Sequence, residues 1–192
     1  MGLDVAQLGQ VFTPPNVVAF MLDLCRNTGR VLEPSAGDGA FFDTLRQRGA
    51  EVVGIEIDRG VAPQGAQVGD FFAYPLDEQF DTIVGNPPYV RYQDVARETK
   101  QHLHSDLFDA RSNLFLFFIE KAVRHLKPGG ELVFIVPREF IKLTAAKKLN
   151  AWLYEQGSIT HFYETGDVRV FDGATPNCAI FRFEKGRRDR HM

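Results

Sequence analysis

Short apolar runs alternate with segments of helical spacing along most of this chain, and this alternation limits the possible folds more than any other feature. It predicts an α/β protein with a mostly parallel sheet, an antiparallel C-terminal strand and helices on both faces. We expect strands at 30–32, 51–58, 66–68, 80–84, 131–137, 158–164 and 178–184, and helices at 16–27, 40–48, 112–126 and 144–156. The segment 90–111 is polar and weakly patterned, so we expect a long loop there with some helix.

Length and composition indicate one globular domain, residues 1–185, followed by a loose basic tail, residues 186–192. No apolar run approaches the roughly 20 residues that span a bilayer. Cys25 and Cys178 imply neither a disulfide framework nor a zinc site, which favours a cytoplasmic protein. The histidines show no metal-ligand spacing, so we expect no metal and place these residues at the surface: His102, His104, His125 and His161. The net charge of −3 does not indicate a nucleic-acid binder.

A glycine-containing loop, EPSAGDG at residues 33–39, follows a strand and opens a helix. Glycine lets a ligand approach the backbone closely, and the start of a helix offers free N–H groups. The loop lacks the lysine and hydroxyl residue of a phosphate-binding loop, and Glu33 and Asp38 would repel phosphate. A cationic ligand suits it better. Taken alone, the loop is equally compatible with a simple tight turn.

Acids at two further strand ends favour a nucleotide-like ligand. Glu56 lies about 20 residues after the glycine loop, where an acid binds ribose hydroxyls in dinucleotide folds. In GDFF, Asp70 could accept from an exocyclic amine and Phe71 could cover a purine face. The alternative is that Glu56 and Asp58 are surface acids at the end of a strand and that Phe71 belongs to the core.

The stretch NPPY, residues 86–89, ends a buried strand with two prolines, which cannot continue a central strand. An exocyclic amine is a poor nucleophile because its lone pair is delocalised into the ring. Two acceptors, the Asn86 side-chain oxygen and the Pro87 carbonyl, could hold both N–H bonds and free that lone pair. Pro87 and Pro88 would fix the carbonyl in advance, and Tyr89 could stack on an extruded base. The alternative is a turn after an edge strand.

Six stretches in this order resemble motifs X, I, II, III, IV and VIII of the gamma-class N6-adenine DNA methyltransferases: GQVFTPP, LEPSAGDGAF, VVGIEID, GDFF, VGNPPYVRY and VFDGATPNCAIFRF. The resemblance spans nearly the whole chain. It implies a Rossmann-like methyltransferase fold with S-adenosylmethionine as cofactor and S-adenosylhomocysteine as product. It also implies a double-stranded DNA substrate whose target adenine leaves the helix.

The resemblance also assigns residues. It implies cofactor contacts by Thr13, Glu33, Pro34, Ser35, Ala36, Gly37, Asp38, Glu56, Ile57, Asp70, Phe71 and Asn86. It implies catalytic contacts by Asn86, Pro87, Pro88, Tyr89 and Phe171. Thr13 would lie near the methionine part of the cofactor and also cap the first helix, and Glu33 would face the α-amino group. Phe171 would stack on the target base, unless it is a core or loop phenylalanine.

The sequence departs from this family after motif VIII, where gamma-class enzymes continue into a target-recognition region. We therefore expect recognition in a longer protein or in a separate chain, and a cognate restriction endonuclease as a further partner. One alternative is an NPPY methyltransferase that acts on a protein glutamine or an RNA base amine. Another is a cofactor-binding regulatory module without catalysis.

Overall fold

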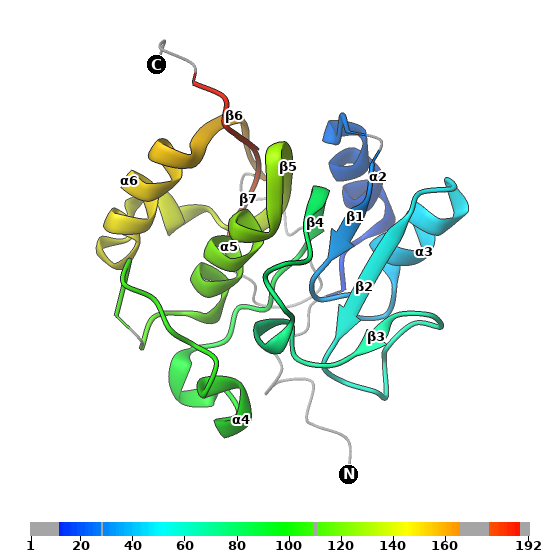
Figure 1. Ribbon diagram of the computed structural model, residues 1–192, viewed down its shortest axis with the longest axis horizontal. Coiled ribbons are helices and arrows are strands. Elements are labelled where there is room, and N and C mark those ends of the chain that lie inside the picture. Colours follow the sequence, from blue (N-terminus) through cyan, green and yellow to red (C-terminus); the bar gives the residue numbers. More distant parts are fainter. Residues whose placement is uncertain (1–11, 28, 110, 166–176, 189–192) are drawn as a thin grey trace.

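The computed structural model describes residues 12–27, 29–109, 111–165 and 177–188, which form a seven-stranded sheet (Figure 1). Its strands are β1 (Val31–Glu33), β2 (Val52–Glu56), β3 (Gln67–Val68), β4 (Phe80–Gly85), β5 (Leu126–Pro137), β6 (Gly157–Glu164) and β7 (Cys178–Lys185). Their order is β3-β2-β1-β4-β5-β7-β6, and β7 runs antiparallel to both of its neighbours. The predicted fold class is confirmed.

Helices cover both faces of this sheet. They are α2 (Pro15–Leu24), α3 (Ala40–Gln47), α4 (Arg97–Lys100), α5 (Leu114–His125) and α6 (Lys147–Gln156), with short 3₁₀ helices η1 (Phe71–Ala73), η2 (Tyr92–Asp94), η3 (Arg138–Lys142) and η4 (Thr144–Ala146). Figure 1 shows α2 and α3 on one side and α5 and α6 on the other. Because strand side chains alternate between faces, Val31 packs with α2 and α3 while Leu32 packs with α5 and α6.

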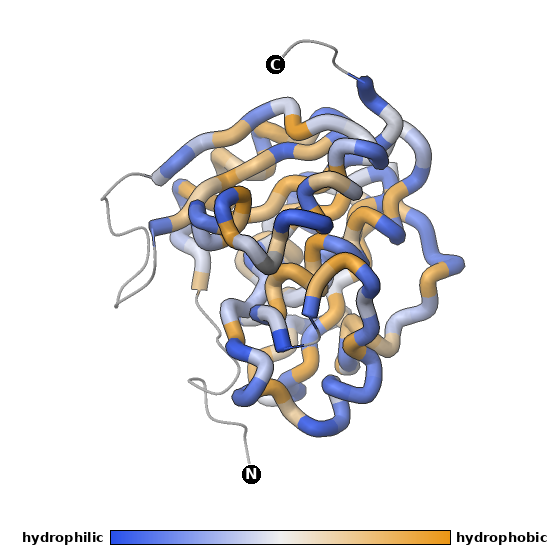
Figure 2. Tube along the Cα trace, turned by 90° about the vertical axis from the view of Figure 1, so that its left-hand side faces the viewer, coloured by the Kyte–Doolittle hydropathy of each residue, from blue (hydrophilic) through white to orange (hydrophobic). Residues whose placement is uncertain are grey.

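The parallel strands β1, β2, β4 and β5 end at the same edge of the sheet, here called the carboxyl edge. Figure 2 shows apolar residues gathered along the interior segments and hydrophilic residues on many outer turns. The loops that leave the carboxyl edge are thus supported by a packed core, which is the arrangement that positions ligand sites in such sheets.

Three local predictions were wrong. Pro14 is the N-cap residue of α2 and provides no side-chain bond, so Thr13 does not cap that helix. Asn113, and not Ser112, caps α5, because its side chain accepts from the Phe115 N–H at 3.4 Å. His125, which was predicted to lie at the surface, is fully buried. Its Nδ1 lies 2.8 Å from the Glu78 carbonyl oxygen, and aromatic rings surround it.

A buried ion pair between β5 and β7 ties α2 to the sheet. Arg182 of β7 donates to one carboxylate oxygen of Glu131 of β5 through Nε at 2.7 Å and Nη2 at 2.6 Å. The other Glu131 oxygen accepts from the backbone N–H groups of Arg26 and Asn27, each at 2.7 Å. The pair therefore holds the segment that follows α2 against β5, and with it the position of α2 over the sheet.

Within the described ranges, no helix is long and apolar enough to cross a bilayer. The same part of the chain contains no group of three His, Cys, Asp or Glu side chains arranged to hold a metal ion.

Candidate active site

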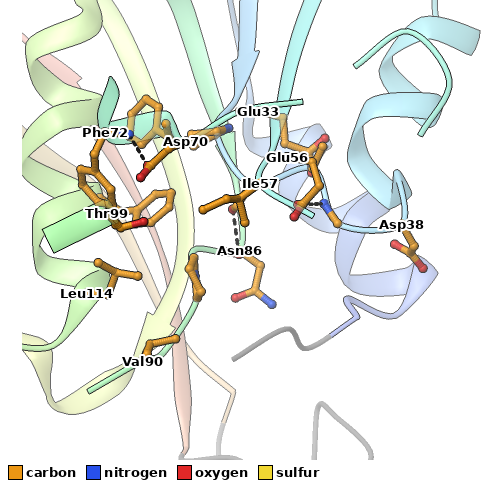
Figure 3. A pocket seen from close by; sticks show the side chains of 18 of the residues that line it. Glu33, Asp38, Glu56, Ile57, Asp70, Phe72, Asn86, Val90, Thr99 and Leu114 are labelled. Atoms are coloured by element: carbon orange, nitrogen blue, oxygen red, sulfur yellow. Dashed lines mark hydrogen bonds between the residues drawn. The ribbon is translucent and has the colours of Figure 1, made fainter. Parts of the chain in front are cut away.

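A cavity of about 370 Å³ opens at the carboxyl edge, between the loops that follow β1 to β4 and the segment 90–118 (Figure 3). In Figure 3, Glu33, Asp38 and Glu56 lie on one side, and Asp70, Phe72, Thr99 and Leu114 lie on the other. The structure brings these predicted residues together in its lining: Thr13, Glu33, Pro34, Ser35, Ala36, Gly37, Asp38, Glu56, Ile57, Asp70, Phe71, Asn86 and Pro88. Pro87 and Tyr89 are not part of the lining, and Phe171 lies outside the described residues.

The glycine loop reaches the cavity through its backbone. Gly37 has a φ of +53°, a backbone conformation that residues other than glycine rarely adopt. A Cβ atom at Gly37 would meet open space, so backbone conformation and not crowding requires glycine there. The Ala36 N–H donates to the Ile55 carbonyl oxygen at 2.8 Å, which fastens the loop to β2.

Glu56 joins the glycine loop to the loop after β2. Its Oε2 accepts from the Gly37 N–H at 2.7 Å, and its Oε1 accepts from the Asp58 N–H at 2.9 Å. The side chain is only 4% exposed, which rules out the alternative that Glu56 is a surface acid. Two backbone donors fix the carboxylate in the cavity wall.

Glu33, the last residue of β1, is a buried acid at the cavity with 1% exposure. Burial raises the pKa of its carboxyl group well above the ordinary value; the Phe42 N–H opposes this, and the nearby Glu56 and Asp38 add to it. Among the described residues, its Oε2 has no hydrogen-bond partner. Since an unpaired buried carboxylate is unfavourable, this oxygen suits a cationic or hydrogen-bond-donating ligand group. The α-amino group of S-adenosylmethionine fits that requirement.

The loop after β3 supplies the far end of the cavity. The Asp70 Oδ1 accepts from the Phe72 N–H at 2.8 Å and so caps η1. Phe71 lines the cavity but is only 3% exposed, and its ring stacks on Phe118 with centroids 5.2 Å apart. Phe71 is therefore a core residue as well as a lining residue. Ile57, at 41% exposed, offers a more open apolar surface in the same lining.

Lys121 of α5 supports the part of the cavity wall that η1 forms. Its Nζ donates to the carbonyl oxygens of Phe72 and Tyr74, each at 2.7 Å. Burial lowers the pKa of its ammonium group to about 8, although the charge of Asp70 acts in the opposite direction. The lysine thus holds η1, and with it Asp70, in place.

The NPPY loop (residues 86–89) is bonded to three parts of the protein. The Asn86 Nδ2 donates to the Thr13 hydroxyl at 3.2 Å, and the Ser35 hydroxyl donates to the Asn86 carbonyl oxygen at 3.2 Å. The Tyr89 hydroxyl donates to the Ile135 carbonyl oxygen of β5 at 2.9 Å. Burial raises the pKa of the Tyr89 hydroxyl well above its ordinary value. Asn86 is therefore held in the cavity wall, while Tyr89 is fastened to the sheet beside it.

The sequence did not predict one wall of the cavity. It comes from the segment 90–118, whose lining residues are Val90, Asp94, Val95, Ala96, Thr99, Leu114 and Phe118. Of these residues, Val90 alone lies in a motif, VGNPPYVRY. The available signal was the pair of valines, Val90 and Val95, which are buried in an otherwise polar segment.

The sheet order 3-2-1-4-5-7-6, with an acid-lined cavity and the NPPY loop at its carboxyl edge, gives this chain the fold of S-adenosylmethionine-dependent methyltransferases. The chain belongs to the Eco57I restriction-modification methylase family, whose model matches residues 56–171. The match confirms the family resemblance of the sequence motifs as far as membership of the restriction-modification methylases.

Curated relatives agree with this assignment. The type II methyltransferase M.TthHB8I of Thermus thermophilus is 39% identical over 93% of this chain and 45% of its own length. The type II methyltransferase M.HincII of Haemophilus influenzae is 33% identical over 94% of this chain and 38% of its own length. The chain thus spans less than half the length of these relatives.

Solved structures show the same fold at low identity. A protein of Listeria monocytogenes described as a class I S-adenosylmethionine-dependent methyltransferase has a TM-score of 0.72 at 20% identity, covering 100% of this chain and 64% of that one. The type ISP restriction-modification enzyme LlaGI, solved with a DNA substrate mimic, has a TM-score of 0.67 at 17% identity. The match covers 95% of this chain and 27% of that one.

Proposed function

We propose that this chain is the catalytic part of a site-specific DNA adenine-N6 methyltransferase within a restriction-modification system. It would transfer a methyl group from S-adenosylmethionine to the exocyclic amine of an adenine that has left the duplex. The observation that carries this proposal is that Asn86 of the NPPY loop lies in the wall of the acid-lined cavity, held there by Thr13 and Ser35. The names of the relatives, which are type II methyltransferases, support a DNA substrate.

Three acids along the cavity would each bind a different part of the cofactor. Glu33 would bind the α-amino group, Glu56 the ribose hydroxyls, and Asp70 the adenine amine, with Ile57 and Phe71 beside the purine ring. Pro34, Ser35, Ala36, Gly37 and Asp38 would surround the methionine part, with Thr13 opposite them. When bound, S-adenosylmethionine supplies a methyl group activated by the positive charge on its sulfur.

The NPPY loop would act on the target amine. The Asn86 side-chain oxygen and the Pro87 carbonyl oxygen would accept from the two N–H bonds and draw the nitrogen toward tetrahedral geometry, which frees its lone pair. Because the prolines and the Thr13 and Ser35 bonds fix these groups beforehand, little reorganisation accompanies the reaction. Tyr89 and Phe171 would hold the extruded base by stacking on its two faces.

The proposal extends to the whole protein. Residues 1–185 would form the catalytic domain and residues 186–192 a basic tail. Target recognition would come from a region outside this chain, a cognate endonuclease would be the functional partner, and the enzyme would be cytoplasmic. An NPPY methyltransferase of a protein glutamine or an RNA base amine is the second candidate, because such a substrate also presents a planar, conjugated NH2 group to Asn86.

Transfer of tritiated methyl from S-adenosylmethionine to DNA, RNA and protein, followed by nucleoside analysis, tests the proposal. The protein should be the longer form or this chain with its recognition partner. We expect labelled N6-methyladenine from DNA. Label in protein or RNA alone would support the second candidate, and cofactor binding without transfer to any substrate would indicate a regulatory module.

A further inference from the structure

The carboxyl edge of the sheet carries opposite charges at its two ends. Acids end or follow β1, β2 and β3 at one end: Glu33, Asp38, Glu56, Asp58 and Asp70. Basic residues follow β5 at the other end and are here called the basic strip: Arg138, Lys142, Lys147 and Lys148. Figure 1 shows β2 and β3 on one side of the molecule and α6, which begins in the basic strip, on the other. Since β4 lies between β1 and β5, the NPPY loop stands between the acidic and basic ends.

The lysines of the basic strip are exposed and available. Glu139 is the one acid in the sequence from 138 to 148, within a chain of net charge −3. Arg138 is paired with two acids, Glu139 at 3.1 Å and Glu164, the last residue of β6, at 3.9 Å. In the part of the chain that the structure describes, no ion pair or hydrogen bond engages the ammonium groups of Lys142, Lys147 and Lys148.

The stability of α6 does not explain these charges. Lys147 and Lys148 occupy the first turn of α6, where the helix dipole disfavours positive charge. Ala146, the N-cap residue, makes no side-chain bond that would offset this. Two lysines at this position slightly oppose helix formation, which points to a role outside the fold.

The other basic segment at this edge, residues 91–111, differs because its four Lys and Arg residues are matched by four Asp and Glu residues, and several of its cations are engaged locally. Arg91 is paired with Asp94 at 2.9 Å, and Arg111 with Asp109 at 3.3 Å. Lys100 donates to the Gln93 carbonyl oxygen at 3.2 Å. This segment therefore presents far less uncompensated positive charge than the basic strip.

The basic strip adjoins the NPPY loop. It begins at Arg138, three residues after Ile135, whose carbonyl oxygen accepts from the Tyr89 hydroxyl. Ile141 and Leu143, on either side of Lys142, are 44% and 37% exposed. This surface thus combines free ammonium groups with apolar side chains next to the proposed position of the target base.

We propose that the basic strip binds the phosphate backbone of duplex DNA and so determines the side from which DNA reaches the NPPY loop. DNA would lie over β5 and the start of α6, because the acids at the other end repel a polyanion, and those of them that line the cavity would bind the cationic cofactor. This inference rests on the proposed function, since it assumes a DNA substrate. It assigns the non-specific part of DNA affinity to three lysines of this chain.

The test is a titration of a fluorescein-labelled duplex with chain 1–192 by fluorescence anisotropy over a range of KCl concentrations. The variant is Lys142→Ala with Lys147→Ala and Lys148→Ala. If each lysine neutralises one phosphate, the slope of log affinity against log salt falls in magnitude by about 2.7. Between about 50 and 200 mM salt, the wild type then loses roughly 40-fold more affinity than the variant does.

The matched control removes three positive charges from the opposite edge of the sheet, where α3 and β7 end: Arg48→Ala with Arg187→Ala and Arg188→Ala. We expect this control to keep the wild-type slope. The lysine variant should bind S-adenosylhomocysteine with wild-type affinity and unfold at the same or a higher temperature, because the basic strip does not line the cavity.

A wild-type salt slope in the lysine variant would overturn the inference, as would equal losses in variant and control. If the wild-type chain shows no salt-dependent DNA binding, the inference also fails, even when the longer protein methylates DNA. The proposed function fails by a different result, which is that the longer protein transfers no methyl group to DNA.

Discussion

The Tyr89 hydroxyl donates a hydrogen bond to the Ile135 carbonyl oxygen, 2.9 Å away, and joins the end of the NPPY loop to β5. The Cys178 sulfur lies 3.8 Å from the same hydroxyl, and the Phe115 ring meets the Tyr89 ring edge-on. The tip of the tyrosine is therefore engaged inside the protein. A base could use the ring of Tyr89 but not its hydroxyl group.

Tyr89→Phe should separate the structural role of the Tyr89 hydroxyl from the proposed stacking role of its ring. Loss of the buried bond to Ile135 is expected to lower the free energy of unfolding by about 1 kcal/mol, measured by urea denaturation. The ring remains, so the single-turnover methylation rate should stay near that of the wild type. Tyr89→Ala also removes the stacking surface, worth roughly 1–3 kcal/mol per base, and should weaken the extrusion signal of 2-aminopurine at the target position. Equal extrusion by both variants would exclude Tyr89 from base capture.

Asn86→Ala should slow the chemical step by about 10²–10³-fold, by analogy with the loss of a preorganised oxyanion-hole donor. Asn86 would act on the target amine, so S-adenosylhomocysteine affinity should change little. Single-turnover methylation at saturating cofactor measures the first effect and calorimetry the second. A wild-type rate in this variant would show that the NPPY loop is only a turn and that Asn86 does not act on the target amine.

Thr13→Val tests whether the Thr13 hydroxyl orients the Asn86 amide, which donates to it at 3.2 Å. The substitution keeps the shape of the side chain and removes the acceptor. We expect a smaller loss of rate than in Asn86→Ala, and no further loss when the two substitutions are combined. Additive losses in the double variant would show that Thr13 acts independently of Asn86.

Glu56→Ala should weaken S-adenosylhomocysteine binding by roughly 10- to 100-fold, as expected for the loss of hydrogen bonds to a charged group. The same change removes the acceptor for the Gly37 and Asp58 N–H groups, so the melting temperature of the free protein should also fall. Asp58→Ala is the matched control, because Asp58 is two residues away and outside the cavity lining. Unchanged affinity in Glu56→Ala would remove Glu56 from the cofactor site.

The sequence predicted the position of the cavity because strand ends of a parallel sheet meet at one edge. Glu33, Glu56 and Asp70 are far apart in the chain but lie at the ends of strands β1, β2 and β3, so the topology alone brings them together. Local periodicity was sufficient to place those strands within a few residues of their observed bounds.

Contacts between distant segments could not be predicted in the same way. Thr13 seemed to be a helix cap, yet it accepts from Asn86, 73 residues away. Glu131 and Arg182 were ordinary members of two predicted strands, and only the β5–β7 pairing brings their buried charges together. His125 was assigned to the surface because helical spacing does not show that a loop carbonyl, that of Glu78, covers it.

Glu33→Gln should make the free protein more stable and the cofactor complex weaker. The pKa of the Glu33 carboxyl group is raised in the folded protein by burial, so ionisation of this group opposes folding. The stability of the wild type relative to the glutamine variant should therefore be highest below the ordinary glutamate pKa and fall as pH rises toward the raised value. Thermal unfolding of both ligand-free proteins over a pH series measures this difference.

Ligand binding should show the opposite dependence on pH. An ammonium group requires the carboxylate form of Glu33, so S-adenosylhomocysteine affinity of the wild type should increase as pH rises through the raised pKa. Binding below that value should release a proton, which calorimetry in buffers of different ionisation enthalpy detects. Glu33→Gln should bind weakly without this proton release, whereas Asp38→Asn, an exposed acid of the same loop, should retain it. Proton release that persists in Glu33→Gln would show that another group, and not Glu33, receives the cofactor's amino group.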